Sequence, residues 1–299
     1  MQQGEPGMSF EIFTDSSANL STALIEKYHL HILSLTFQEK GVPGEYKSFD
    51  NGRPIDTTIF YRRMRDENAV FITSCVNTAD AMEAIEPVVA AGSDVLYLGF
   101  SSGLSATHQN VKAALDELRA KYPERKIYDS DTLAAALGQG LLVVLAARRR
   151  EKGATIEETH RWVEENKLHL CHWFTVESLK YLHRGGRISA TSAIVGTLLD
   201  IKPVLHVDDA GKLIAMTKVR GVRAAVKEMF ERMKATAVRD PDSPVFIVHA
   251  DIRERASELA EKIRAEFGTK EIYIDSLDLV IGAHSGPGTL ALFFVGDHR

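Results

Sequence analysis

The sequence predicts an α/β protein of two domains: an N-terminal α/β domain built on a parallel sheet and a C-terminal mixed α+β domain. Its 299 residues exceed one typical core. The first half alternates short apolar runs with helical patterns, which is typical of strand–helix–strand units. The second half mixes hairpin signals with helices. We place the boundary near residue 160, so that the domains are 1–160 and 161–299.

Three apolar runs in the first half are typical of buried parallel strands, and hydroxyl residues follow each of them. The runs are Phe10–Phe13, Ala69–Ile72 and Val95–Leu98. The segments that follow are Thr14-Asp15-Ser16-Ser17, Thr73-Ser74 and Ser101-Ser102-Gly103-Leu104-Ser105. Ligands of open parallel sheets bind beyond the carboxyl ends of the strands, where hydroxyl and backbone N–H groups suit a small anion. The sequence therefore predicts an anion site at these strand ends.

Helix signals separate these strands. Asn77 is a candidate N-cap for a helix that ends at Gly92. A further strand is expected at Lys126–Asp129, and Ser130-Asp131-Thr132 is expected to open a long alanine-rich helix. Thr155 and Glu158 form a capping-box pattern for the next helix.

The second half has strand and turn signals at shorter spacing. A helix from Val222 carries apolar residues at a 3.6-residue period, and another is expected over Ile252–Phe267. Asp208-Asp209-Ala210-Gly211 is typical of a hairpin turn. The expected strands are Leu170–Thr175, Lys202–Val207, Lys212–Thr217, Val245–His249, Glu271–Asp275 and Thr289–Val295.

Composition excludes several classes of function. The net charge of −5 argues against a nucleic-acid binder and against attraction to anionic membranes. No apolar run approaches the roughly 18 residues needed to span a bilayer, so we expect no stable membrane insertion. The first residues lack the pattern of a signal peptide. Two cysteines, Cys75 and Cys171, do not make a disulfide framework, and a cytoplasmic location is expected.

Two enzymatic alternatives remain open. Gly99-Phe100-Ser101-Ser102-Gly103 matches the nucleophile elbow of α/β hydrolases, with Ser101 as nucleophile. Asp275 or Asp278 with His284 would complete a triad in the hydrolase order. The other alternative is a phosphate- or nucleotide-binding enzyme, although the chain has neither a glycine-rich dinucleotide fingerprint nor a Walker A sequence.

Two segments that contain histidine are interpreted differently, one as structural and the other as a ligand contact. His169, Cys171 and His172 lack a second cluster at zinc-type spacing, so we predict a structural role and no metal. His284 precedes Gly286-Pro287-Gly288, whose glycines permit tight turning and close backbone approach. A histidine held on such a loop is placed to contact a ligand.

With these segments identified, the chain resembles the DegV family of fatty-acid-binding proteins from Phe10 to Val295. Six segments in the same order carry the resemblance. They are Thr14–Leu20, Thr73-Ser74, Ser101–Thr107, Leu182–Ser189, Ile201–Val204 and His284–Thr289.

The resemblance implies a non-catalytic protein that buries one long-chain fatty acid, with the carboxylate in the interdomain cleft and no cofactor. It also implies a partner, the catalytic chain of a bacterial fatty acid kinase, which would phosphorylate the presented carboxylate. Expected carboxylate contacts are Thr73, Ser74, Ser101, Ser102 and His284. Asp15, Ser16, Ser105 and Gly286 would line the cleft. Arg184, Gly185, Gly186 and Arg187 would face the kinase.

Burial of an acyl tail is energetically sufficient for binding. Each methylene contributes about 0.8 kcal/mol, so a tail of roughly fifteen contributes on the order of 12 kcal/mol before ordering costs. The second domain has apolar candidates for a tunnel wall: Ile194, Val195, Leu198, Leu199, Ile201, Val204, Leu205, Phe230, Leu277, Leu279, Val280 and Ile281. Ala106 and Cys75-Val76-Asn77 depart from the residues usual in the family, which leaves the preferred chain length open.

Overall fold

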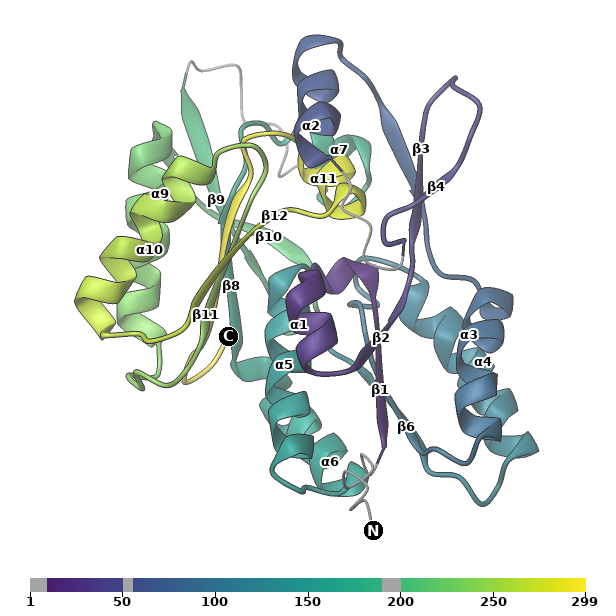
Figure 1. Ribbon diagram of the computed structural model, residues 1–299. Helices are drawn as coiled ribbons and strands as arrows, with labels where there is room; N and C mark the ends of the chain where they lie inside the picture. Colours follow the sequence, from purple (N-terminus) through teal and green to yellow (C-terminus); the bar gives the residue numbers. More distant parts are fainter. Residues whose placement is uncertain (1–9, 51–55, 190–199) are drawn as a thin grey trace.

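The computed structural model in Figure 1 describes residues 10–50, 56–189 and 200–299. Within these residues the strands form three sheets. A four-stranded parallel sheet has the order β2 (Leu30–Leu33), β1 (Glu11–Asp15), β6 (Val95–Gly99), β7 (Ile127–Asp131). A six-stranded mixed sheet has the order β10 (Leu213–Arg220), β9 (Ile201–Val207), β8 (Leu170–Thr175), β13 (Leu290–Val295), β11 (Val245–His249), β12 (Ile272–Ser276). A small antiparallel sheet has the order β4 (Tyr46–Lys47), β3 (Thr36–Glu39), β5 (Phe71–Ser74).

The helices cover these sheets in layers. They are α1 (Thr22–Lys27), α2 (Thr57–Asp66), α3 (Thr78–Ala90), α4 (Thr107–Lys121), α5 (Leu137–Glu151), α6 (Ile156–Asn166), α7 (Lys180–Arg184), α9 (Val222–Thr236), α10 (Arg253–Phe267) and α11 (Leu279–Ser285), with 3-10 turns η1 (Ser16–Ala18) and η2 (Lys167–His169). None of the described helices is long and apolar enough to cross a membrane.

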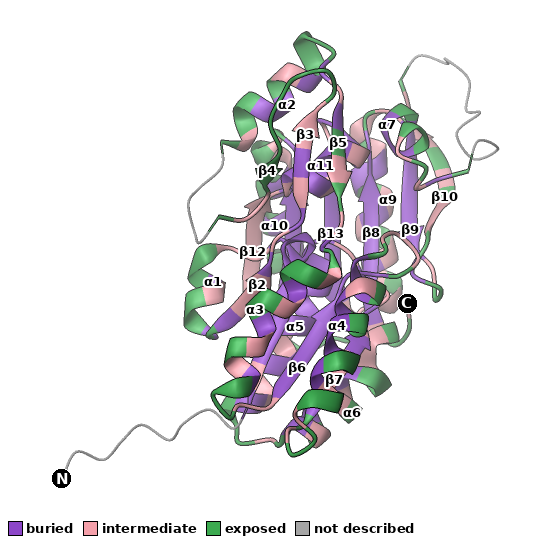
Figure 2. Ribbon diagram, turned by 90° about the vertical axis from the view of Figure 1, so that its right-hand side faces the viewer, coloured by how far each residue is buried: buried purple, intermediate pink, exposed green. Residues whose placement is uncertain are grey.

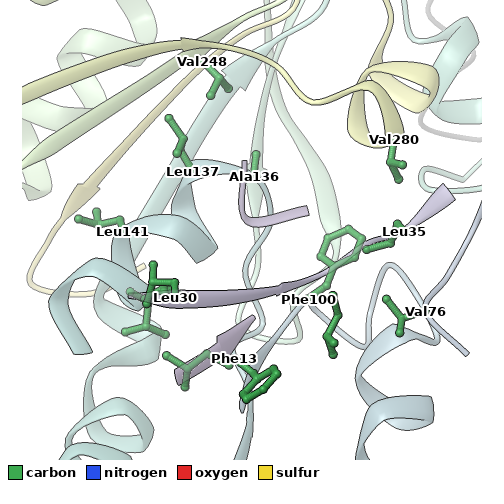
Figure 3. Packing of buried hydrophobic residues seen from close by; sticks show 14 of the residues in the cluster. Phe13, Leu30, Leu35, Val76, Phe100, Ala136, Leu137, Leu141, Val248 and Val280 are labelled. Carbon is green, nitrogen blue, oxygen red and sulfur yellow. The ribbon is translucent and has the colours of Figure 1, made fainter. Parts of the chain in front are cut away.

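Helix α5 lies between the two larger sheets. It contacts β6 on one side and β8, β11 and β13 on the other, and most of its residues are buried, as Figure 2 shows. Helices α9 and α10 pack on the outer face of the six-stranded sheet, while α3 and α4 lie beyond the parallel sheet (Figure 1). One hydrophobic cluster therefore joins both sheets, from Phe13 of β1 to Val248 of β11 (Figure 3).

Several local predictions are confirmed. The Asn77 side chain accepts the Asp80 N–H at 2.8 Å and caps α3. Thr155 and Glu158 form the predicted capping box of α6. The hairpin turn at 208–211 joins β9 to β10.

The long alanine-rich helix begins later than predicted. β7 continues to Asp131, and the Thr132 hydroxyl donates to the Gly99 carbonyl at 2.7 Å, which keeps the chain extended alongside β6. Helix α5 starts only at Leu137, after Ala136 with its positive φ of 50°.

β5 does not belong to the parallel sheet, contrary to the prediction. It pairs antiparallel with β3, with Thr73 opposite Phe37. Only alternate residues of the run are buried, since Phe71 is buried whereas Ile72 is 43% exposed, and this alternation is typical of a strand with one solvated face. The three hydroxyl-rich strand ends therefore do not share one sheet edge.

The strands divide along the chain. Those of the parallel and small sheets end by Asp131, and those of the six-stranded sheet begin at Leu170. The boundary expected near residue 160 falls inside α6 and stays a prediction.

Candidate functional site

A cavity of about 350 Å³ lies between α11, α7 and the inner face of the six-stranded sheet. This volume is within the range of small-molecule sites, roughly 300–1,000 Å³. Most of its lining is apolar. The lining residues are Leu35, Thr73, Ser74, Cys75, Phe100, Leu104, Ser105, Ala106, Ala135, Ala136, His172, Phe174, Leu182, Arg187, Val207, Leu213, Leu277, Val280, Ile281, His284, Ser285, Thr289, Ala291 and Phe293.

Strand register orders the wall formed by the six-stranded sheet. One cross-strand row contains Leu213 opposite Val207 and His172 opposite Phe293. The adjacent row on the same face contains Phe174 opposite Ala291. From Phe293 to Thr289 the wall extends about 13 Å, at roughly 3.3 Å per residue. The cavity-lining residues of this strand thus run from Thr289, which bonds to Gly286 at the end of α11, to Phe293.

Helix α11 forms the opposite wall. Its residues Val280 and Ile281 line the cavity together with Leu35 and Phe100 from the first half of the chain. Figure 3 shows Val280 pointing toward Leu35 and Phe100. The cavity is therefore enclosed by segments from both halves of the chain.

Polar side chains gather where β5, α7 and α11 meet. Thr73 Oγ1 lies 2.8 Å from His284 Nε2. Ser74 and Ser105 also line this part of the cavity, and the Ser105 hydroxyl lies 2.9 Å from that of Thr107. The structure thus brings together four residues that the sequence singled out from three separate segments.

His284 occupies the last turn of α11 rather than the expected loop. Burial and the neighbouring Arg187 and Arg184 lower the pKa of His284 to about 4, so the ring is neutral at pH 7. When Nε2 carries the proton it donates to Thr73 Oγ1, and the Thr73 O–H is then free to donate to a ligand.

Glycines permit this packing around His284. A Cβ on Gly185 would lie 2.2 Å from His284 Nδ1. Gly286 has a φ of +83°, and a Cβ there would lie 2.2 Å from the Tyr181 ring. Both residues therefore shape the site by the absence of a side chain, and Gly286 is buried behind the cavity wall rather than in it.

Arg187 lines the cavity, although the sequence suggested that it faces a partner. Its Nε donates to the Leu104 carbonyl at 3.2 Å, which turns the guanidinium inward. Burial lowers the pKa of Arg187, but arginine remains charged at neutral pH. Among the described lining residues it carries the one permanent positive charge. Arg184 and Gly186 are exposed, and their contact with a partner stays a prediction.

Ser101 and Ser102 are not among the described residues that line the cavity. Ser101 is fully buried, and its hydroxyl donates to the Gly211 carbonyl at 2.8 Å. Ser102 is exposed, and its backbone N–H donates to the Asp131 carboxylate. The bond to the β9–β10 hairpin thus fixes Ser101 away from the ligand space, and the serine of this loop that reaches the cavity is Ser105.

Asp15 and Ser16 line a different, more polar depression of about 350 Å³. The Asp15 carboxylate is fully buried and accepts the Tyr97 O–H and the Phe100 N–H, both at 2.9 Å. Burial raises the pKa of Asp15. Ser16 Oγ accepts the Leu35 N–H at 2.9 Å. These residues position Phe100 and Leu35 of the cavity wall instead of contacting its contents.

The expected tunnel wall is only partly realised. Leu277, Val280 and Ile281 line the cavity, whereas Leu279 lines the polar depression. Leu205 and Val204 belong to hydrophobic clusters, and Phe230 packs against the cluster beneath α9 and α10. Ile201 begins β9 outside the cavity lining. Ile194, Val195, Leu198 and Leu199 lie outside the described residues.

Sequence reasoning did not place Arg187, Ser285, Thr289 or His172 in the lining of the cavity. Only His172 had a usable signal, because it alternates with Phe174 on one face of β8. Its Nδ1 lies 2.8 Å from the Leu170 carbonyl, and burial holds the pKa of His172 well below its usual range. No group of three or more metal-ligating side chains occurs in the described segments.

Comparisons with known proteins agree with these features. A family model described as an uncharacterised protein of the DegV family matches residues 9–297. A DegV domain-containing protein of Clostridium perfringens is 44% identical over 294 residues, covering 97% of this chain and 98% of the relative. A DegV lipid-binding protein from Thermotoga maritima has a similar structure, with a TM-score of 0.85 at 29% identity, covering 98% of this chain and 100% of the other. A DegV family protein from Thermus thermophilus, whose structure is described by its fatty acid binding, has a TM-score of 0.86 at 26% identity over 97% and 100% of the two chains.

Proposed function

The chain belongs to the DegV family, and from this premise we propose that it binds one long-chain fatty acid in the cavity. The observation that carries the proposal is a mostly apolar cavity whose lining extends along β13 and includes several hydroxyl groups and one arginine. Amphipathic ligands of this kind need both features, a dry wall for the tail and donors for the head group. The lipid- and fatty-acid-binding relatives support the same assignment.

The carboxylate belongs at the polar end. A buried carboxylate is costly unless it accepts hydrogen bonds. Thr73, Ser74 and Ser105 supply hydroxyl donors there, and Arg187 supplies a positive charge. Neutral His284 orients the Thr73 hydroxyl. Relative to the sequence-based assignment, Ser105 takes the place of Ser101 and Ser102.

The tail then runs along β8 and β13 toward His172 and Phe293. At about 0.8 kcal/mol for each buried methylene, this wall supplies most of the binding free energy. The head group determines which end of the ligand lies under α11.

We further propose that the protein presents its carboxylate to the catalytic chain of a fatty acid kinase. The polar end of the cavity adjoins the exposed Arg184 and Gly186, so a partner docked there would be close to the head group. In this role the chain itself catalyses no reaction and needs no cofactor, and its place of action is the cytoplasm.

The hydrolase alternative has little geometric support. The buried Ser101 hydroxyl donates to the Gly211 carbonyl, and His284 is hydrogen-bonded to Thr73 rather than to Ser101. Asp278 caps α11 through the N–H groups of Val280 and Ile281. A predominantly apolar cavity also favours a lipid over a phosphate or nucleotide.

Native mass spectrometry of the purified chain tests the binding proposal. We expect a co-purifying mass of one C14–C18 fatty acid, or a one-to-one complex after palmitate is added to delipidated protein. A chain that stays empty with palmitate, yet cleaves a chromogenic ester in a Ser101-dependent way, would contradict it.

The kinase proposal needs a separate assay. Palmitate-loaded protein is mixed with a bacterial fatty acid kinase catalytic chain and ATP, and acyl phosphate is trapped with hydroxylamine. Formation of the hydroxamate only when both proteins are present is expected, with Arg184→Ala slowing it even at saturating palmitate. No hydroxamate with several kinase chains would reject this role but leave binding intact.

A further inference from the structure

Ser285 is a buried hydroxyl on the cavity wall without a partner. Its side chain is 4% exposed and lines the cavity. No hydrogen-bond partner for Ser285 Oγ occurs among the described residues. Other buried hydroxyls nearby differ, since Thr289 Oγ1 donates to the Gly286 carbonyl at 2.7 Å.

An unpaired buried hydroxyl destabilises the protein. Leaving a buried polar group unsatisfied costs about 1–3 kcal/mol. A serine in a helix can remove this cost by donating to the carbonyl four residues earlier, here that of Ile281, and Ser285 does not do so. The hydroxyl therefore gives up no hydrogen bond within the described residues when it turns toward a group inside the cavity.

The surroundings of Ser285 select the kind of group. It follows His284 directly, in the turn of α11 that reaches the polar end of the cavity. Arg187 lines the same cavity and supplies a positive charge there. An electron-rich, negatively charged oxygen is favoured here, and a carboxylate can accept about four hydrogen bonds.

We infer that Ser285 donates a hydrogen bond to the carboxylate of the bound fatty acid and selects acids over neutral lipids of the same length. This inference rests on the proposed fatty-acid binding and adds a specificity-determining residue to that site. The ligand-free protein carries the cost of the unpaired hydroxyl, and the bound carboxylate relieves it.

The test compares Ser285→Ala with wild type on two ligands and on stability. Isothermal titration of delipidated protein measures palmitate and hexadecan-1-ol, and thermal unfolding is recorded without ligand. We expect palmitate affinity to fall about tenfold or more, since hydrogen bonds to charged groups are among the strong ones. Hexadecan-1-ol affinity should change little, and the unfolding midpoint of the ligand-free variant should be unchanged or higher.

Ser130→Ala is the matched control. Ser130 is equally buried, but its hydroxyl donates to Glu164 at 2.6 Å and lies outside the cavity lining. This variant should lose stability and keep palmitate affinity. Ser285→Cys, with a weaker donor of similar shape, should bind palmitate with intermediate affinity, and it replaces the alanine variant if that one does not fold.

The outcomes separate the two proposals. If wild type binds palmitate and Ser285→Ala binds it equally well, the role of Ser285 is wrong and the function stands. Equal losses for the acid and the alcohol would place Ser285 against the tail and overturn the head-group contact. If wild type binds neither ligand, the proposed function itself fails.

Discussion

The His284 ring and the Thr73 hydroxyl lie 2.8 Å apart, although 211 positions separate them in the chain. The bond joins the end of β5 to the last turn of α11, two elements that contact each other beside the cavity. Neither residue comes from the parallel sheet, where an open α/β fold usually binds its ligands. The site is instead built where the small antiparallel sheet meets the second half of the chain.

Thr73→Val should weaken palmitate binding about tenfold or more, because it removes a donor to a charged group while keeping the side-chain shape. Isothermal titration of delipidated protein measures the change. Thr236→Val is the control, since that hydroxyl donates to the Arg232 carbonyl at the end of α9, far from the cavity lining. Equal palmitate affinities of the two variants would show that Thr73 does not contact the head group.

Gly185→Ala should reduce palmitate affinity by displacing His284, whose Nδ1 would lie 2.2 Å from the new Cβ. Gly186→Ala separates this effect from backbone strain, because its φ is +73° and a Cβ at that position would meet no atom within 4 Å. That variant should lose stability but bind palmitate normally. If both variants bind equally well, the packing of Gly185 on His284 has no role in binding.

Asp278→Asn should change the pH dependence of stability. Burial raises the pKa of Asp278 to about 7 from 3.8, so the folded protein takes up a proton more readily than the unfolded chain between these values. The associated stability is fully present below about pH 4 and is lost as pH rises through about 7. An amide oxygen can still accept the Val280 and Ile281 N–H groups.

Urea unfolding at pH 5 and pH 8 measures this effect. Relative to wild type, Asp278→Asn should become more stable as pH rises, by at most about 1.4 kcal/mol per pH unit. Asp56→Asn changes an exposed cap of the same kind on α2 and is the control for losing a capping carboxylate. A pH-independent difference for Asp278→Asn would contradict a proton held at this cap.

Leu213→Ala should relax the preference for acyl-chain length. Leu213 lines both the cavity and a neighbouring depression of about 700 Å³, so its side chain helps to separate them. Affinities for hexadecanoic and icosanoic acids are compared by titration. The ratio of the affinity for icosanoic acid to that for hexadecanoic acid should be higher in the variant than in wild type. Met216→Ala, at an exposed position of the same strand, should leave this ratio unchanged. An unchanged ratio would show that Leu213 does not limit the tail.

The amino-acid sequence by itself determined the local elements. Three local features depend on residues only a few positions apart: the Asn77 cap, the Thr155–Glu158 capping box and the hairpin turn at 208–211. They can therefore be recognised from the sequence without knowing the fold. Thr73 and His284 could be singled out for the same reason, one at a strand end and the other before Gly286-Pro287-Gly288.

Only the tertiary structure decided which side chains face the cavity. The Ser101 hydroxyl donates to the Gly211 carbonyl, 110 positions away, and Arg187 Nε donates to the Leu104 carbonyl. Ser285 is left unpaired within the described residues by the way α11 packs. Such outcomes depend on contacts between distant segments, which local periodicity does not encode, because hydrogen-bond partners and burial are fixed only when the sheets and helices assemble.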